Sequence, residues 1–323
     1  MDRRQVGTSG LRVSALGLGT MTWGRDTDAV DAAEILRTFA DAGGTLVDTA
    51  ASYGDGDAER VLGELLDGKV ARDDLVLCTK AGVRHGPDGA LRDASRGGLL
   101  GELDGSLERL GTDHVDLFLV ACPDPTTPLE ETVSALRLAV SSGRTRYVGL
   151  SNFPAWASAR AATLLAAADG VGLTALELEY SLLQRGVERE AVPAAEALGL
   201  GLLAWSPLGR GVLTGKYRRS VPADSRAASD HLAGFVAPYL DDDGAASVVE
   251  AVATAAEGLG RTPLEVALAW LLARPTTASA LVGARTPAQL HGPVAAADLD
   301  LPAEVHAALD DVSGIFLGYP ERW

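Results

Sequence analysis

The sequence contains few cysteines, few lysines and no long apolar run. Its two cysteines, Cys78 and Cys122, lie in or just after apolar stretches. This predicts packed or near-site thiols in a reducing compartment rather than a disulfide framework. Lysine occurs only at positions 69, 80 and 216, so Lys80 and Lys216 stand out in the motifs that contain them. No apolar run reaches the roughly 18 residues of a membrane span, and no span is expected.

Positive charge is also scarce, since the formal net charge is −16 and the sequence pI is about 4.7. This argues against nucleic acid or an anionic membrane as the partner, but it leaves room for a local basic site that holds a phosphorylated small molecule. The first residues include two adjacent arginines without a following apolar stretch, so no signal peptide is expected. The five histidines show no metal-ligand spacing, and no metal site is predicted. We expect a cytoplasmic protein, monomer or homo-oligomer, with a small-molecule substrate.

Short apolar runs alternate with helical segments along the chain. A hairpin is expected over Gln5–Ser14, and eight strand-like runs follow it at roughly even spacing. These runs are Leu16–Thr20, Leu46–Thr49, Leu75–Thr79, Val115–Val120, Tyr147–Leu150, Leu173–Leu178, Leu200–Trp205 and Ser279–Val282. Strand–helix alternation predicts a parallel sheet, and eight units predict an α/β fold of the (β/α)8 barrel type, as a single domain over residues 1–323.

An open doubly wound sheet is the alternative architecture. It would need a GxGxxG motif after the first strand and an acidic residue about 20 positions later. The segment Gly17–Thr20 lacks the third glycine, and the helix after it begins too late. The barrel is therefore favoured. Residues Pro207–Gly244 interrupt the alternation and are expected to form a long loop at the C-terminal face.

Polar or aromatic side chains end most of the predicted strands. Barrel active sites are built at the C-terminal strand ends, so these residues should form one ring. In chain order they are Thr20, Asp48, Lys80, Ala121, Ser151 with Asn152, Glu177, Trp205 with Ser206, and Gly283. Asp48 and Lys80 end adjacent strands, and Tyr53 follows closely. A buried Asp–Lys pair would hold positive charge near the phenol, favour its ionised form and make it a proton donor near neutral pH.

Five motifs together resemble the aldo-keto reductase superfamily, in particular bacterial branches that act on sugars and natural-product intermediates. They are DTAASYGDGDAERVLGELL from Asp48, TKAG from Thr79, SLERLGTDHVDLFLV from Ser106, GRTRYVGLSNF from Gly143 and WSPLGRGVLTGKY from Trp205. The resemblance runs from Leu16 to about Leu290. It implies a barrel that binds NADPH extended across its mouth, without a separate dinucleotide-binding domain.

By this resemblance Tyr53 matches the proton donor, and Asp48 and Lys80 match the pair that lowers its pKa. Further positions match residues that hold the carboxamide, stack on the nicotinamide, wrap the pyrophosphate and surround the 2′-phosphate. Ser151 and Asn152 match the residues that hold the carboxamide, and Trp205 matches the one that stacks on the nicotinamide. The residues that match the pyrophosphate loop are Ser206, Leu208, Gly209, Gly211 and Lys216. The segment around the 2′-phosphate is matched by Gly283–Thr286 with Gln289, where Arg285 is the expected charged contact. Loop residues expected to overhang the mouth are candidates for the substrate pocket, with solvated loop positions as the alternative: Trp23, Arg84 and His85.

Three positions depart from the pattern of that family. Ala121 stands where a histidine usually donates to the substrate oxygen, and losing one such donor typically costs about 100- to 1,000-fold in rate. Ala121 therefore also counts as a candidate pocket residue. Glu177 replaces a cofactor-binding glutamine and can donate a hydrogen bond only when protonated. Gly292 and Pro293 replace a Glu-Asn pair that usually holds the adenine amine.

Three functions remain open at this point. The first is NADPH-dependent reduction of a ketone or aldehyde, with Tyr53 as proton donor. The second is reduction of a conjugated C=C or a C=N bond, for which a histidine at Ala121 is not needed. The third is a non-catalytic NADPH-binding sensor or regulatory subunit, against which the retained Asp48, Tyr53 and Lys80 argue. Either enzyme is expected to work in sugar or secondary metabolism.

Overall fold

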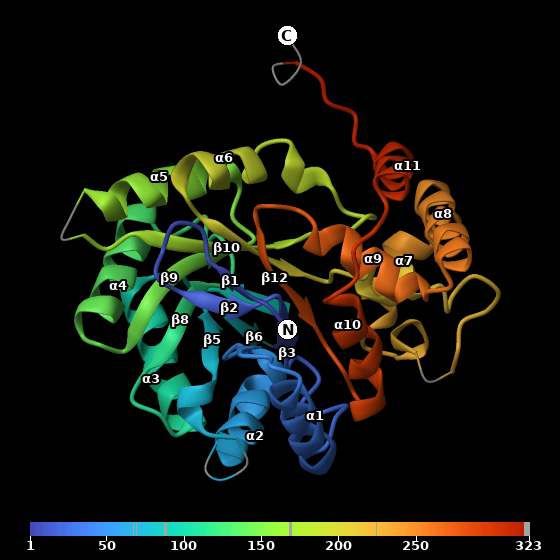
Figure 1. Ribbon diagram of the computed structural model, residues 1–323. Helices are drawn as coiled ribbons and strands as arrows, with labels where there is room; N and C mark the ends of the chain where they lie inside the picture. Colours follow the sequence, from blue (N-terminus) through green and yellow to red (C-terminus); the bar gives the residue numbers. More distant parts are fainter. Residues whose placement is uncertain (67, 69, 87–88, 168–169, 224, 320–323) are drawn as a thin grey trace.

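The computed structural model describes residues 1–66, 68, 70–86, 89–167, 170–223 and 225–319. Across these residues eight parallel strands close into a barrel that helices surround (Figure 1). In order around the barrel the strands are β3 (Leu16–Gly19), β4 (Leu46–Asp48), β5 (Val76–Ala81), β8 (Val115–Val120), β9 (Thr145–Ser151), β10 (Leu173–Glu179), β11 (Gly201–Trp205) and β12 (Thr277–Val282). The barrel closes where Ala280 pairs with Leu16. The predicted (β/α)8 barrel is confirmed.

A small antiparallel hairpin covers the N-terminal end of the barrel. It consists of β1 (Arg3–Gln5) and β2 (Arg12–Ser14), as the sequence predicted. Its Val6 and Val13 are buried with inward-facing barrel residues, among them Leu117. With this end closed by apolar packing, the opposite, C-terminal end is the one left for chemistry.

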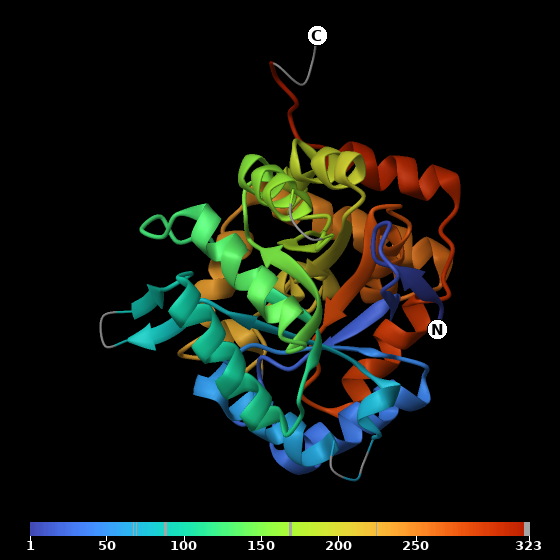
Figure 2. The same ribbon diagram turned by 90° about the vertical axis from the view of Figure 1, so that its left-hand side faces the viewer.

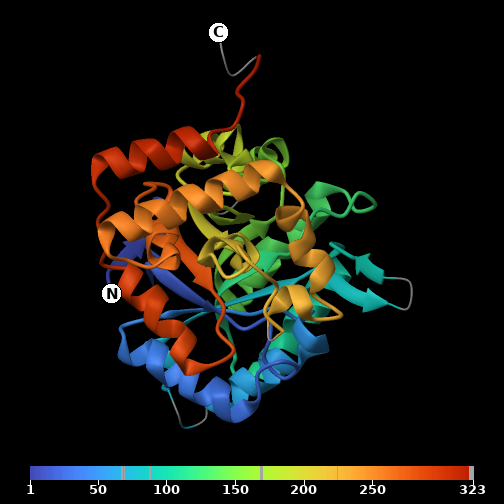
Figure 3. The same ribbon diagram turned by 90° about the vertical axis from the view of Figure 1, so that its right-hand side faces the viewer.

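The outer helices present apolar faces to the barrel. They are α1 (Ala29–Asp41), α2 (Asp57–Leu66), α3 (Arg96–Leu110), α4 (Leu129–Ser141), α5 (Ala155–Ala166), α6 (Ala191–Leu198), α8 (Asp243–Leu259), α9 (Pro263–Leu272), α10 (His291–Ala296) and α11 (Ala303–Ser313). In α1 the apolar spacing buries Ile35, Leu36 and Phe39 on one side. Asp28 caps this helix by accepting hydrogen bonds from the N–H groups of Val30 and Asp31. Late in the chain, α11 packs against α8 (Figure 3). No helix of the described chain is long and apolar enough to cross a membrane.

Two loop regions differ from the sequence prediction. The segment Pro207–Gly244 is not an unstructured loop, because it contains α7 (Ala233–Leu240). It also holds short 3-10 turns. The other 3-10 turns lie outside this segment. In chain order, the 3-10 turns of the described residues are η1 (Tyr53–Gly56), η2 (Arg72–Asp74), η3 (Gly186–Glu188), η4 (Gly209–Thr214), η5 (Arg226–Ala228) and η6 (Pro287–Leu290). Of these, η4 and η5 lie within the segment Pro207–Gly244. The loop after β5 forms an unpredicted hairpin, β6 (Val83–Gly86) with β7 (Gly89–Arg92), which stands away from the barrel (Figure 2).

Candidate active site

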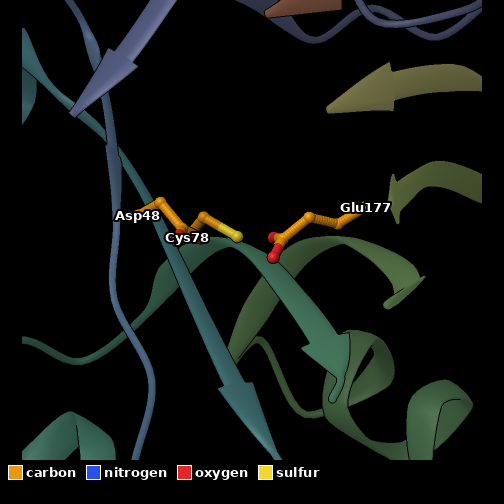
Figure 4. Close-up of side chains that lie close together, drawn as sticks. All are labelled: Asp48, Cys78 and Glu177. Atoms are coloured by element: carbon orange, nitrogen blue, oxygen red, sulfur yellow. The ribbon is translucent and has the colours of Figure 1, made fainter. Parts of the chain in front are cut away.

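An ammonium group lies between two carboxylates inside the mouth of the barrel. Lys80 Nζ, on β5, is 2.5 Å from Asp48 Oδ1 and 3.3 Å from Glu177 Oε1. All three side chains are almost completely buried. Asp48 and Glu177 come from well-separated strands of the barrel and point toward one another (Figure 4). The strand ends therefore bring together the predicted Asp–Lys pair and add a third ionisable group, Glu177.

The charge state of this cluster follows from its burial. Burial and the neighbouring Asp48 carboxylate raise the pKa of Glu177 to about 8, although Lys80 opposes the shift. For Lys80, burial lowers the pKa, but Asp48 and Glu177 together raise it well above its usual value. Near neutral pH, Lys80 is thus an ammonium and Glu177 holds a proton. A protonated carboxyl can donate a hydrogen bond, as the glutamine of the family pattern does.

Tyr53 is the first residue of η1, in the loop that follows β4. Lys80 Nζ lies 5.2 Å from the centroid of the Tyr53 ring. Burial raises the pKa of the Tyr53 phenol; Lys80 lowers it, and Asp48 and Glu177 raise it further. The net shift is upward, so the expectation that the Asp–Lys pair favours the ionised phenol is wrong. Burial and two carboxylates outweigh one ammonium. The phenol remains protonated at neutral pH, which is the form that a proton donor requires.

The same cluster contains atoms that suit a metal ion. One ligand atom from each of Asp48, Cys78 and Glu177 lies within 4.8 Å of the others (Figure 4). Burial raises the pKa of the Cys78 thiol well above its usual value, whereas metal ligation needs the thiolate. Lys80 Nζ already supplies positive charge to both carboxylates. We therefore interpret the cluster as an ion-pair centre.

Asn152 joins three strand ends through its side-chain amide. Its Nδ2 donates to the Ala121 carbonyl at 2.9 Å and to Ser151 Oγ at 3.0 Å. Its Oδ1 accepts from Trp205 Nε1 at 3.0 Å. Ser151 Oγ in turn donates to Glu177 Oε1 at 3.4 Å. The residues predicted to hold the nicotinamide thus form one hydrogen-bonded group, and at Ala121 the side chain offers no donor.

Backbone strain is concentrated at this end of the barrel. Among the described residues, four that are not glycine have a positive φ: Asp55 (53°), Asn152 (60°), Ser206 (49°) and Arg210 (59°). Each lies in a segment that follows the C-terminal end of a barrel strand. Such conformations cost about 1–3 kcal/mol each and cluster at functional sites. Their shared location is independent support for a site at the barrel mouth.

The loop after β11 brings bare glycine backbone and a lysine together, an arrangement that could hold a phosphate. Gly209 and Gly211 have φ values of 54° and 95°. The carbonyl oxygen of Leu208, just before this turn, accepts a hydrogen bond from the N–H of Gly211. A Cβ atom at Gly211 would lie 3.4 Å from Lys216 Nζ, so the ammonium sits beside bare backbone. Glycine lets a ligand approach the chain closely, and the lysine adds positive charge.

A second basic group lies where β12 ends. A Cβ atom at Gly283 would lie 3.4 Å from Arg226 Nη2, and Gln289 Oε1 accepts from the N–H of Arg285 at 2.8 Å. Burial and the nearby charge of Arg285 lower the pKa of Arg226. Within the described chain no carboxylate forms an ion pair with Arg226. The sequence analysis missed Arg226. It lies in the long segment 57 positions before Gly283, and arginine is abundant in this sequence, so nothing marked this one out.

The predicted pocket residues are not all at the surface of the mouth. Trp23 has no exposed area, so the expectation that it lines an accessible pocket is corrected: it packs in the core under its loop. Arg84 on β6 pairs with Glu102. His85 Nδ1 lies 3.1 Å from Asp55 Oδ1, in the turn that carries Tyr53. Ala121 is partly exposed at the end of β8.

Comparisons with known proteins agree with this geometry. The sequence model of the aldo/keto reductase family matches residues 15–313. The chain is 35% identical over 322 residues to the uncharacterized oxidoreductase YrpG of Bacillus subtilis, covering 97% of this chain and 96% of the relative. It is 35% identical over 327 residues to a probable voltage-gated potassium channel subunit beta of Oryza sativa, covering 100% and 98%. The L-glyceraldehyde 3-phosphate reductase of Escherichia coli is also 35% identical, over 90% of this chain and 86% of the relative.

Proposed function

This chain belongs to the aldo/keto reductase family of oxidoreductases, and we propose that it is an NADPH-dependent reductase of a small organic acceptor in sugar or secondary metabolism. The acceptor bond is a ketone or aldehyde C=O, a conjugated C=C or a C=N. The observation that carries the proposal is the buried Asp48–Lys80 pair directly beside Tyr53. The two free cysteines, one of them fully buried, support a reducing compartment, and we propose the cytoplasm.

NADPH, when bound, supplies a hydride. The residues at the mouth suit each of its parts. Trp205 offers a flat face for the nicotinamide, and the group formed by Ser151, Asn152 and Glu177 offers donors and acceptors for the carboxamide. The glycine turn with Lys216 suits the pyrophosphate. The 2′-phosphate fits the basic group at Gly283, because the partly buried Arg226 forms no ion pair with a carboxylate of the described chain and Arg285 places a second positive charge near it.

In this proposal Tyr53 donates the phenolic proton to the acceptor atom that gains electron density when the neighbouring atom receives hydride. The acceptor is thereby reduced, with one new C–H bond and one new O–H, N–H or C–H bond. Tyr53 is left as a phenolate. Lys80 lies beside the ring, and its ammonium stabilises this anion until a proton from water restores the phenol. Asp48 holds the ammonium in place.

The decisive experiment replaces Tyr53 by phenylalanine. Consumption of NADPH is followed against panels of ketones, aldehydes, enones and cyclic imines, with products identified by mass and NMR. We expect Tyr53→Phe to lower turnover by about 100-fold or more while NADPH still binds. Tyr147→Phe, a change at the N-terminal end of the barrel, is the matched control and should leave turnover unchanged. Full activity of Tyr53→Phe would reject the assigned donor.

A non-catalytic NADPH-binding regulatory subunit is the second candidate. Two observations favour it: the missing donor side chain at Ala121, and the likeness to plant proteins named as probable potassium channel beta subunits. Tight NADPH binding without consumption of the cofactor by any acceptor of the panel would support this candidate.

A further inference from the structure

Helix α7 lies against the tryptophan that is proposed to stack on the nicotinamide. The rings of Phe235 and Trp205 are nearly parallel, with centroids 6.4 Å apart and an angle of 18° between their planes. Phe235 is carried by α7, a helix that the sequence did not predict, and Trp205 ends strand β11. The position of the indole therefore depends on how α7 is held on the barrel.

An ion pair holds α7 in this position. Arg210 donates to Glu179 through Nε at 2.8 Å and through Nη2 at 2.7 Å, which is a bidentate arrangement. Both side chains are largely buried. Arg210 Nη1 also donates to the Phe235 carbonyl at 2.5 Å, and Tyr239 Oη donates to Glu179 Oε1 at 3.0 Å. Glu179 on β10 thus connects the barrel to α7 through one arginine and one tyrosine.

Phe235 and the guanidinium of Arg210 lie on the same side of the indole. The guanidinium carbon is 4.0 Å from the Phe235 ring centroid and 6.0 Å from that of Trp205. Groups on opposite faces of the indole, each about 6 Å from it, would lie much farther apart than 4.0 Å. Phe235 and Arg210 therefore approach the indole from one side. Its indole N–H is fixed by Asn152.

We propose that Glu179 and Arg210 are positioning residues that hold Phe235 against one face of Trp205, so that the indole presents its other face to the nicotinamide at a fixed angle. This inference rests on the proposed NADPH-dependent function. It explains why Arg210 keeps a positive φ between two glycines, since that backbone turns its side chain back over α7. It also gives the long segment after β11 a role besides binding phosphate.

The test compares Glu179→Gln, Phe235→Leu and Phe235→Tyr with wild type. Phe235→Leu keeps apolar bulk and removes the flat ring, whereas Phe235→Tyr keeps the ring. Glu250→Gln is the control, because Glu250 forms a similar two-bond pair with Arg218 on the exposed surface of α8. The measurements are the dissociation constant of NADPH, the single-turnover rate of hydride transfer, kcat and KM for the acceptor, and the thermal midpoint.

We expect Glu179→Gln and Phe235→Leu to weaken NADPH binding and to slow hydride transfer by about 10- to 100-fold, the cost of a small misplacement. KM for the acceptor should change less than kcat. Phe235→Tyr and Glu250→Gln should behave as wild type. If Glu179→Gln fails to fold, Phe235→Leu decides alone.

Two results overturn the inference, and they are distinguishable. If wild type consumes NADPH and folded Phe235→Leu transfers hydride at the wild-type rate, the positioning role is wrong and the proposed function stands. If wild type does not bind NADPH, both fail together.

Discussion

Replacing Glu177 by glutamine should remove a loss of stability that the wild-type protein suffers as pH rises. The pKa of Glu177 is about 8 in the folded protein, against an ordinary value of 4.5. Between these values the folded protein keeps a proton that the unfolded chain releases. The free energy of unfolding therefore falls as pH increases through this window and levels off above it. Glutamine has no proton to release, so the variant should lack this fall.

The size of the effect follows from the pKa difference. A difference of 8 − 4.5 = 3.5 corresponds to roughly 5 kcal/mol at about 1.4 kcal/mol per unit, and this is an upper bound. The titration belongs to the whole cluster, because Lys80 contacts both Glu177 and Asp48. Glutamine also keeps the acceptor at this point, because its oxygen can take the position of Oε1, which accepts from Ser151 Oγ and lies 3.3 Å from Lys80 Nζ.

Urea unfolding at several pH values between about 5 and 9 measures the effect. We expect the curves of wild type and Glu177→Gln to separate progressively as pH rises, with the variant more stable at the alkaline end. Glu250→Gln is the control, since that carboxyl is exposed and its pKa is lowered by Arg218. Curves that fall in parallel for wild type and Glu177→Gln would show that another group releases the proton and would refute the assignment.

Three further changes test other parts of the site and the core. Ala121→His should raise kcat/KM for simple aldehydes by about 10- to 100-fold, because it adds a hydrogen-bond donor at the end of β8. If the wild type already reduces simple aldehydes rapidly and the variant lowers kcat/KM, the argument from the missing donor is wrong. Arg226→Gln should weaken NADPH binding about tenfold or more and leave NADH binding unchanged; equal losses for both cofactors would reject the phosphate contact. Phe118→Ala should lower the free energy of unfolding by about 3–5 kcal/mol in urea, since this ring is fully buried; a loss under about 1 kcal/mol contradicts its place in the core.

The barrel could be predicted because each strand and helix carries a local signal. Ile35, Leu36 and Phe39 have helical spacing, and Asp28 begins their helix, so no distant contact is needed to recognise it. The ring of strand-end residues follows from the parallel direction of the strands alone. For this reason the pairing of Asp48 with Lys80 could be predicted from the sequence.

The features that the sequence did not predict depend on contacts between distant segments. Helix α7 is short and contains Pro238, so its spacing carries little signal, and Glu179 on β10 helps to hold it through Arg210 and Tyr239. Arg226 meets Gly283 only because the long segment folds back over β12. The upward pKa shift of Tyr53 comes first from burial, to which Asp48 and Glu177 add, and both the burial and the approach of Glu177 to Lys80 are properties of the closed barrel.

The two departures at Ala121 and Glu177 lie at the ends of one hydrogen-bonded chain. Asn152 donates both to the Ala121 carbonyl and to Ser151, and Ser151 donates to Glu177. Where the family pattern has an imidazole and an amide, this chain has a methyl group and a carboxyl that holds its proton near neutral pH. The donor at the substrate position is lost, whereas at the cofactor position a protonated carboxyl can still donate, as an amide would. Only the position next to the acceptor therefore loses a donor. Within the proposed function, this loss separates a simple carbonyl from a bond whose reacting atom does not need a second hydrogen bond. A conjugated C=C or a C=N bond meets that condition, and we propose it beside the ketone or aldehyde; the panel of acceptors distinguishes them.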